Sequence, residues 1–68
     1  MAKYYVNDNA QSNGDHEVHE ETCSWLPLIQ SKTSLGNFTS CFPAVIEAKK
    51  VYKQSNGCKF CSSACHTQ

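Results

Sequence analysis

The residues most suited to chemistry are concentrated in one short segment near the end of the chain. Residues 58–66 read Cys-Lys-Phe-Cys-Ser-Ser-Ala-Cys-His, so three thiols and an imidazole lie within a few positions of one another. Thiolates and imidazoles are preferred zinc ligands, and two residues between a pair of cysteines allow a tight turn to direct both sulfurs at one ion. The segment therefore indicates metal or thiol chemistry, although it names no substrate.

A structural zinc ion needs four ligands, and the sequence favours Cys58, Cys61 and Cys65 as three of them. His66 directly follows Cys65, and two neighbouring residues rarely bind one ion without backbone strain. The fourth ligand therefore stays open, with a histidine or Cys23 favoured. The candidates for that position are His66, Cys23, His16, His19 and Cys41.

The same cysteines allow other interpretations. Cys58 and Cys61 form a C-x-x-C pair, which supports thiol–disulfide exchange when it begins a helix in a βαβ unit, but here the pair follows the predicted helix. A structural disulfide could join two of the five cysteines, or all could be reduced core residues. The C-x-x-x-C-H pattern at 61–66 is one residue longer than the haem-attachment motif C-x-x-C-H. Haem attachment would also need export, which the N-terminus does not support, so we do not favour this interpretation.

A second segment of interest contains two histidines. It reads His16-Glu17-Val18-His19 and is one residue shorter than the H-E-x-x-H motif of zinc proteases. In a strand, its two histidines point to opposite faces. We therefore interpret them as surface histidines of an acidic strand, with one serving as the fourth metal ligand as the alternative. No catalytic triad, phosphate-binding loop or carboxylate pair can be defended, so the sequence predicts a protein that is not an enzyme.

Length and composition indicate that this chain needs a cross-link. A core built from 68 residues rarely contributes more than about 3–5 kcal/mol, and five cysteines, an odd number, cannot all pair within the chain. The N-terminus lacks the apolar segment of a secretory signal, and no apolar run is long enough to span a bilayer. We therefore expect a cytoplasmic protein with reduced thiols and no membrane association.

The charge balance argues against a nucleic-acid partner. Six basic and six acidic side chains give a formal net charge of zero, which leaves no strong electrostatic footprint for a phosphate backbone. We expect a protein partner, whose identity the sequence does not give.

The pattern of turn and apolar residues predicts a single α+β domain over 1–68. Strands are expected at about 3–7 and 16–20, joined by a polar loop, and a third strand is considered at 29–35. A helix is expected at about 40–54, because cap residues and a first-turn proline precede an apolar-periodic run. The predicted fold is a small antiparallel hairpin or three-stranded sheet packed on one helix, with a cysteine knuckle at 58–66.

Four segments together resemble a group of small bacterial cysteine-rich proteins with no known function. They are KYYVN at 3–7, NGDHEVH at 13–19, LGxF at 35–38 and NGCxxCxxxCH at 56–66. The resemblance extends over nearly the whole chain. It implies a bacterial, cytoplasmic protein and assigns no activity.

The sequence thus favours a small non-catalytic binding or interaction module with a structural zinc site formed by the C-terminal cysteines. One alternative is a thiol–disulfide redox protein that uses the C-x-x-C pair. The other is a partner-binding domain stabilised by a disulfide or by its core, with no metal.

Overall fold

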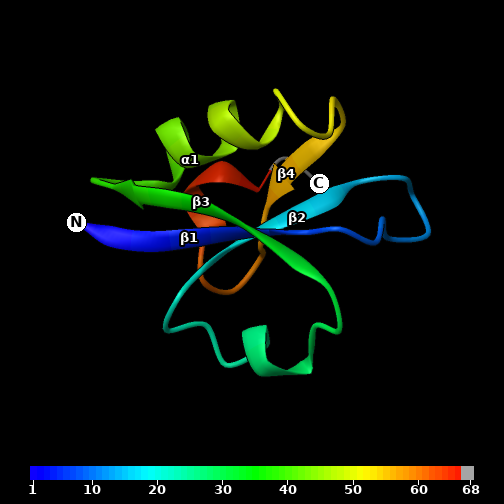
Figure 1. Ribbon diagram of the computed structural model, residues 1–68, viewed down its shortest axis with the longest axis horizontal. Coiled ribbons are helices and arrows are strands. Elements are labelled where there is room, and N and C mark those ends of the chain that lie inside the picture. Colours follow the sequence, from blue (N-terminus) through cyan, green and yellow to red (C-terminus); the bar gives the residue numbers. More distant parts are fainter. Residues whose placement is uncertain (67–68) are drawn as a thin grey trace.

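The N-terminal strand lies in the middle of a four-stranded mixed sheet (Figure 1). The computed structural model describes residues 1–66. Strand β1 (Ala2–Asn7) pairs antiparallel with β2 (His16–Glu20) on one side and with β3 (Lys32–Phe38) on the other. The predicted α+β class and hairpin are therefore confirmed. The sheet is larger than expected, because β4 (Ser55–Gly57) adds to β2 in the parallel direction.

The two faces of the sheet bury different side chains, because successive strand residues point to opposite sides. Helix α1 (Cys41–Ala48) covers one face, which we call the helix face (Figure 1). Tyr4, Val6 and Val18 pack there against the helix. On the other side lies a short 3₁₀ turn, η1 (Leu26–Leu28), over a second cluster that contains three cysteines. We call this second side the cysteine face.

Helix α1 is shorter than the sequence predicted. It begins after Ser40, whose backbone is extended, and ends at Ala48 instead of near residue 54. Ala44 and Ala48 are its fully buried residues, and their small side chains allow the helix to approach the sheet closely. Beyond Ala48 the chain turns, with the Val51 amide donating to the Ala48 carbonyl at 2.9 Å, and Val51 stays exposed.

Strand β3 begins and ends three residues later than the predicted third strand at 29–35. Its register against β1 shifts between Tyr4, opposite Gly36, and Tyr5, opposite Ser34, so Leu35 is an extra residue in a bulge. Gly36 has a φ of +103°, a conformation that glycine adopts without strain. Gly36, one residue beyond the predicted end of this strand, therefore lies inside it.

Residues 55–57, which directly follow the predicted helix, form strand β4. All three are buried, and Gly57 lies opposite Val18. A Cβ atom on Gly57 would come within 2.6 Å of the Cys65 Cβ and 2.7 Å of the Ser62 carbonyl oxygen. Only glycine therefore allows the C-terminal segment to fold back over β4.

One carboxylate connects three distant parts of the chain. Asp8, just after β1, accepts hydrogen bonds from Thr33 Oγ1 at 2.6 Å, Ser31 Oγ at 2.7 Å and Tyr52 Oη at 2.9 Å. These bonds attach the end of β1 to β3 and to the segment that follows α1.

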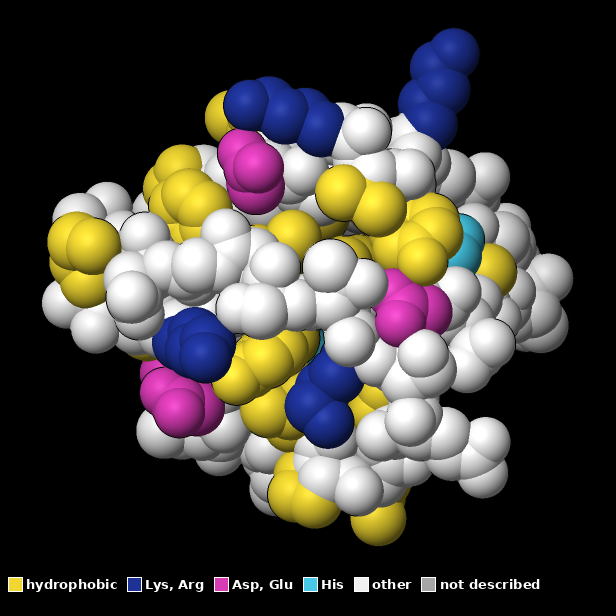
Figure 2. All heavy atoms as spheres, viewed as in Figure 1, with side chains coloured by type: hydrophobic (Ala, Val, Ile, Leu, Met, Phe, Trp, Pro, Cys, Tyr) yellow, Lys and Arg dark blue, Asp and Glu magenta, His cyan; other side chains and the backbone are white. Residues whose placement is uncertain are grey.

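Charged side chains of both signs are interspersed with apolar ones on the face shown in Figure 2. This view agrees with the formal net charge of zero. Among residues 1–66, no helix has the length and apolar character needed to cross a membrane.

Candidate metal centre

Four potential metal ligands converge on the cysteine face. They are His19, Cys23, Cys58 and Cys61, and one ligand atom from each lies within 4.8 Å of all the others. The first three are buried and Cys61 is half-buried. The group combines three sulfurs and one imidazole nitrogen, a donor set typical of structural zinc.

The separations between these atoms fit a tetrahedral ion. The His19 Nδ1 atom lies 3.5 Å from the Cys23 sulfur and 3.9 Å from the Cys61 sulfur, and the Cys23 and Cys58 sulfurs are 4.0 Å apart. With Zn–S near 2.3 Å and Zn–N near 2.0 Å, neighbouring ligands of a tetrahedral zinc are about 3.5–3.8 Å apart. These three separations are within a few tenths of an ångström of the tetrahedral values, and no pair of ligand atoms is more than 4.8 Å apart, so shifts of up to about 1 Å would place all four at bonding distance.

Strand β2 and the turn after it position two of the ligands. Alternation along β2 directs Val18 into the helix face and His19 to the cysteine face. The Cys23 amide then donates to the Glu20 carbonyl at 3.0 Å, and this turn brings the Cys23 sulfur back beside His19.

The segment that directly follows strand β4 supplies the other two ligands, Cys58 and Cys61. The Cys58 amide donates a hydrogen bond to the Val18 carbonyl at 2.9 Å, so Cys58 lies directly beside β2. The Ser62 amide donates to the Cys58 carbonyl at 2.9 Å and closes the turn that contains Cys61. The parallel pairing of β4 with β2 is therefore the feature that joins the C-x-x-C pair to His19.

Glu17 orients the imidazole of His19. Both residues lie on the same side of β2, and Glu17 Oε1 is 3.5 Å from His19 Nε2. This carboxylate favours the tautomer with its proton on Nε2, which leaves the Nδ1 lone pair directed at the sulfurs. Burial lowers the pKa of His19, an effect that the Glu17 charge partly opposes, so the ring is held in the neutral form that a metal requires.

Backbone amides point at two of the sulfurs. The Phe60 amide donates to Cys58 Sγ at 3.4 Å, and the Glu20 amide donates to Cys61 Sγ at 3.3 Å. Such bonds favour a thiolate. Burial nevertheless raises the pKa of Cys61 to about 12, so the free thiol stays protonated at neutral pH, and a bound dication would supply the missing charge compensation.

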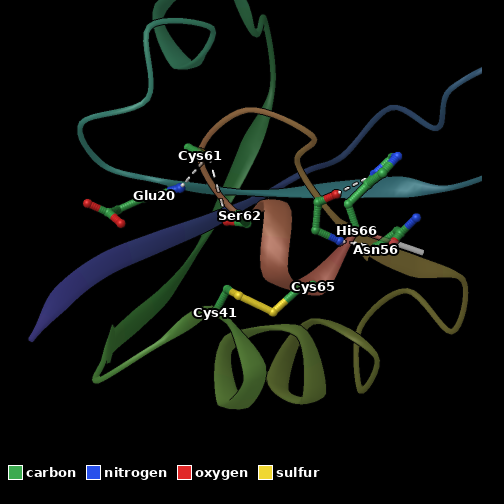
Figure 3. The surroundings of a disulfide bond; sticks show 8 residues. Glu20, Cys41, Asn56, Cys61, Ser62, Cys65 and His66 are labelled. Carbon is green, nitrogen blue, oxygen red and sulfur yellow. Dashed lines mark hydrogen bonds between the residues drawn. A yellow bond between two sulfur atoms is a disulfide. The ribbon is translucent and has the colours of Figure 1, made fainter. Parts of the chain in front are cut away.

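Cys65 and His66, both predicted as ligands, lie outside this group. Cys65 forms a disulfide with Cys41 of α1, with the two Cα atoms 6.3 Å apart (Figure 3). His66 Nδ1 lies 3.0 Å from the Gly57 carbonyl oxygen. The chain turns between Cys61 and Cys65, so Cys65 lies in the core of the helix face, away from the candidate metal centre.

The disulfide differs from the expected reduced state of the thiols. Cys41, a candidate for the fourth ligand position, is buried and covalently bonded to Cys65. Disulfides are rare in the reducing cytoplasm. The helix face thus contains a covalent cross-link, and the cysteine face contains the candidate metal centre.

His19 was one of several candidates for the fourth position, and the structure distinguishes it from His16. The His16 ring stacks on Tyr52 with centroids 3.9 Å apart, and its Nδ1 lies 2.9 Å from the Asn7 carbonyl oxygen. The signal available in the sequence was strand alternation, which places Glu17 and His19 together on one face. The sequence did not show that this face would meet Cys23 and the C-x-x-C pair.

Two cavities border the cluster. The larger, about 660 Å³, has Trp25, Leu28 and Phe60 in its walls together with His19 and Cys58. The Trp25 and Phe60 rings are 5.7 Å apart between centroids. The smaller cavity, about 320 Å³, is lined by Cys23, Cys61 and polar residues of the turn after β2.

No protein-family model, curated protein or solved structure matches this chain. The resemblance to small bacterial cysteine-rich proteins therefore stays a prediction.

Proposed function

We propose that the chain is a small non-catalytic binding module held together on its cysteine face by one zinc ion. The ligands would be His19, Cys23, Cys58 and Cys61. The observation that carries the proposal is the convergence of these four side chains, from three separate segments, within 4.8 Å. The ion would join the turn after β2 to the segment after β4, and its binding energy would then contribute to folding.

Closure of the site supports a structural role over a catalytic one. Catalytic zinc sites typically use three protein ligands and keep one position open for water or substrate. Here four ligands are available, and three of them are buried. A fully coordinated ion has no position left at which to activate water.

The partner surface that we propose is the larger cavity beside the centre. Trp25, Leu28 and Phe60 are 46%, 69% and 67% exposed, and they give this cavity an apolar wall. Trp25 lies two residues after Cys23, and Phe60 lies between Cys58 and Cys61. The ion would therefore hold both sides of this wall in place for an apolar segment of a protein partner.

Metal content of two matched histidine variants tests the zinc assignment. We expect one zinc per chain by elemental analysis in the wild type and in H66A, and loss of zinc from H19A during dialysis against a weak chelator. Cobalt substitution should give the sulfur-to-metal charge-transfer absorption of thiolate ligands, weaker in C61S. Retention of zinc by H19A with loss from H66A would contradict the proposed ligand set.

The thiol–disulfide alternative is tested with the same sample. It requires a metal-free protein in which Cys58 and Cys61 cycle as a pair. A wild type purified under reducing conditions without metal, whose free thiols react rapidly in the folded state, would favour that alternative over zinc.

A further inference from the structure

Two sulfurs of the cluster are already in contact. Cys23 Sγ and Cys58 Sγ lie 4.0 Å apart, although the residues are 35 positions apart in the sequence. Both side chains are buried, with exposed fractions of 6% and 2%. A disulfide bond is about 2.05 Å long, so the two sulfurs would have to approach each other by about 2 Å to form one.

Hydrogen bonds to one strand hold the two backbones in place. The Cys23 amide donates to the Glu20 carbonyl, and the Cys58 amide donates to the Val18 carbonyl, so both residues are anchored to β2 or its end. The sulfurs therefore stay neighbours whether or not an ion lies between them.

The two sulfurs belong to residues that border different cavities. Cys23 and Cys61 line the smaller cavity, whereas Cys58 lines the larger one. A small oxidant entering the smaller cavity would meet Cys23 or Cys61, and one entering the larger cavity would meet Cys58. The product is the same disulfide whichever of Cys23 and Cys58 reacts first, because the other is the second thiol that a disulfide requires.

We propose that the zinc ion and a Cys23–Cys58 disulfide are alternative cross-links of the cysteine face, exchanged by a peroxide. The zinc half of this proposal rests on the proposed function, whereas the choice of cysteine pair rests on the sulfur contact alone. A disulfide would remove two of the four ligands and leave His19 and Cys61, too few to retain the ion. Oxidation would therefore release zinc and still keep the two segments joined.

The chemistry balances with hydrogen peroxide as the oxidant. The Cys23 thiolate attacks one peroxide oxygen, the O–O bond breaks, and a sulfenic acid and hydroxide form. The Cys58 thiolate then attacks the Cys23 sulfur, the S–S bond forms, and the S–O bond breaks to release a second hydroxide. Two protons from solvent convert both hydroxides to water. The two sulfurs lose two electrons, the peroxide gains them, and Zn²⁺ departs.

The pairing differs from the one that the C-x-x-C motif suggests. The Cys61 sulfur accepts a hydrogen bond from the Glu20 amide. It also lies 3.7 Å from Ser62 Oγ and 3.9 Å from His19 Nδ1. Cys58, in contrast, has its sulfur against Cys23. The Cys61 sulfur lies within 4.8 Å of both other sulfurs, and the 4.0 Å contact between Cys23 and Cys58 therefore favours the long-range pair.

Oxidation of the zinc-loaded wild type with limiting hydrogen peroxide tests the proposal. We expect one zinc released per peroxide consumed, followed with a chromogenic zinc indicator. Mass spectrometry of proteolytic fragments should then show Cys23 linked to Cys58, with Cys41–Cys65 retained and Cys61 free. A Cys58–Cys61 link, or zinc release with sulfinic acids and no new link, would overturn the proposal.

Metal-free protein separates this test from that of the zinc site. If the starting protein holds no zinc, the proposed function fails, but oxidation of the same protein still decides the pairing. In the metal-free state C61S should form the Cys23–Cys58 link as the wild type does, and C58S should not form it. A cross-link that disappears in C61S would contradict the proposed pair.

Discussion

At the scale of single residues, Glu17 has the most specific role after the ligands themselves. Its carboxylate lies 3.5 Å from His19 Nε2, on the side of the ring opposite the sulfurs. Carboxylates in this position fix the tautomer of a metal-bound histidine and raise its basicity. The sequence offered Glu17 only as part of an acidic strand, because the partner on the far side of the ring comes from other segments.

Replacing Glu17 by glutamine should therefore weaken zinc binding without removing a ligand. We expect E17Q to lower the zinc affinity by about 10- to 100-fold, measured by competition with a chromogenic chelator. E21Q is the matched control, because Glu21 is an exposed acidic residue outside the site. Equal affinities for E17Q and E21Q would show that the carboxylate has no role in the centre.

Asp8 gives a residue-scale prediction of pH dependence. Hydrogen bonds from Thr33 and then Ser31, with a smaller contribution from Tyr52, hold the pKa of Asp8 below its usual value. A carboxyl with a lower pKa in the folded state stabilises the fold above the unfolded pKa, near 3.9, and loses this contribution as the pH falls through the folded value.

The stability difference between the wild type and D8N should follow that rule. We expect a constant difference in the free energy of unfolding between about pH 6 and 8, which shrinks below about pH 4 as Asp8 is protonated in both states. Urea titrations of chelator-treated protein at several pH values measure it without interference from zinc loss. A difference that persists unchanged at pH 2–3 would contradict the role of the ionised carboxylate.

At the scale of elements, strand alternation and turn residues were enough to predict the first hairpin and the existence of the helix. They were not enough for β4, because three residues containing Asn56 and Gly57 normally indicate a turn. Gly57 forms part of a strand because the chain returns over it, and the Cys65 Cβ occupies the space that a side chain would need. That close approach is a tertiary contact that no local pattern reveals.

The same limit explains which part of the site could be predicted. Spacing identified the C-x-x-C pair, and composition brought Cys23 and His19 into consideration. The fate of Cys65 depends on the position of α1, which supplies Cys41 as its partner. A motif at the end of the chain therefore contributes to two faces of the sheet, whereas the sequence suggested a single knuckle.

The disulfide should stabilise α1 against the rest of the fold. It closes a loop with a sequence separation of 24, for which chain entropy predicts roughly 3–4 kcal/mol of stabilisation. We expect C41A/C65A to lose about this amount in urea unfolding while it retains its zinc. Loss of zinc from a double variant whose circular dichroism shows that it is still folded would contradict the separation of Cys65 from the metal centre.

The number of free thiols checks the disulfide independently. With Cys41 and Cys65 bonded, denatured wild type treated with a chelator should show three reactive thiols in the absence of reductant. Five would mean that the disulfide does not form in the purified protein.

At the scale of the whole molecule, the chain has a small core on each face of its sheet, with a disulfide beside one core and the candidate metal centre beside the other. The helix-face core contains Cys41 and Cys65, and the cysteine-face core contains Cys23 and Cys58. A chain of 68 residues rarely folds stably on apolar burial alone. The disulfide, and the zinc ion that we propose, would therefore add stability to different layers of the fold.

Because the cross-links act on different faces, their removal should have separate signatures. Chelation should lower the melting temperature and shift the emission of the single tryptophan, Trp25, to longer wavelength, because Trp25 lies two residues after Cys23. Reduction alone should lower the melting temperature with little change in that emission, because the disulfide lies on the helix face. Removal of both should unfold the chain, observed as loss of near-ultraviolet circular dichroism. A chain that stays folded without either cross-link would show that its core is sufficient by itself. A chelator that changes neither the melting temperature nor the Trp25 emission would contradict the proposed zinc site.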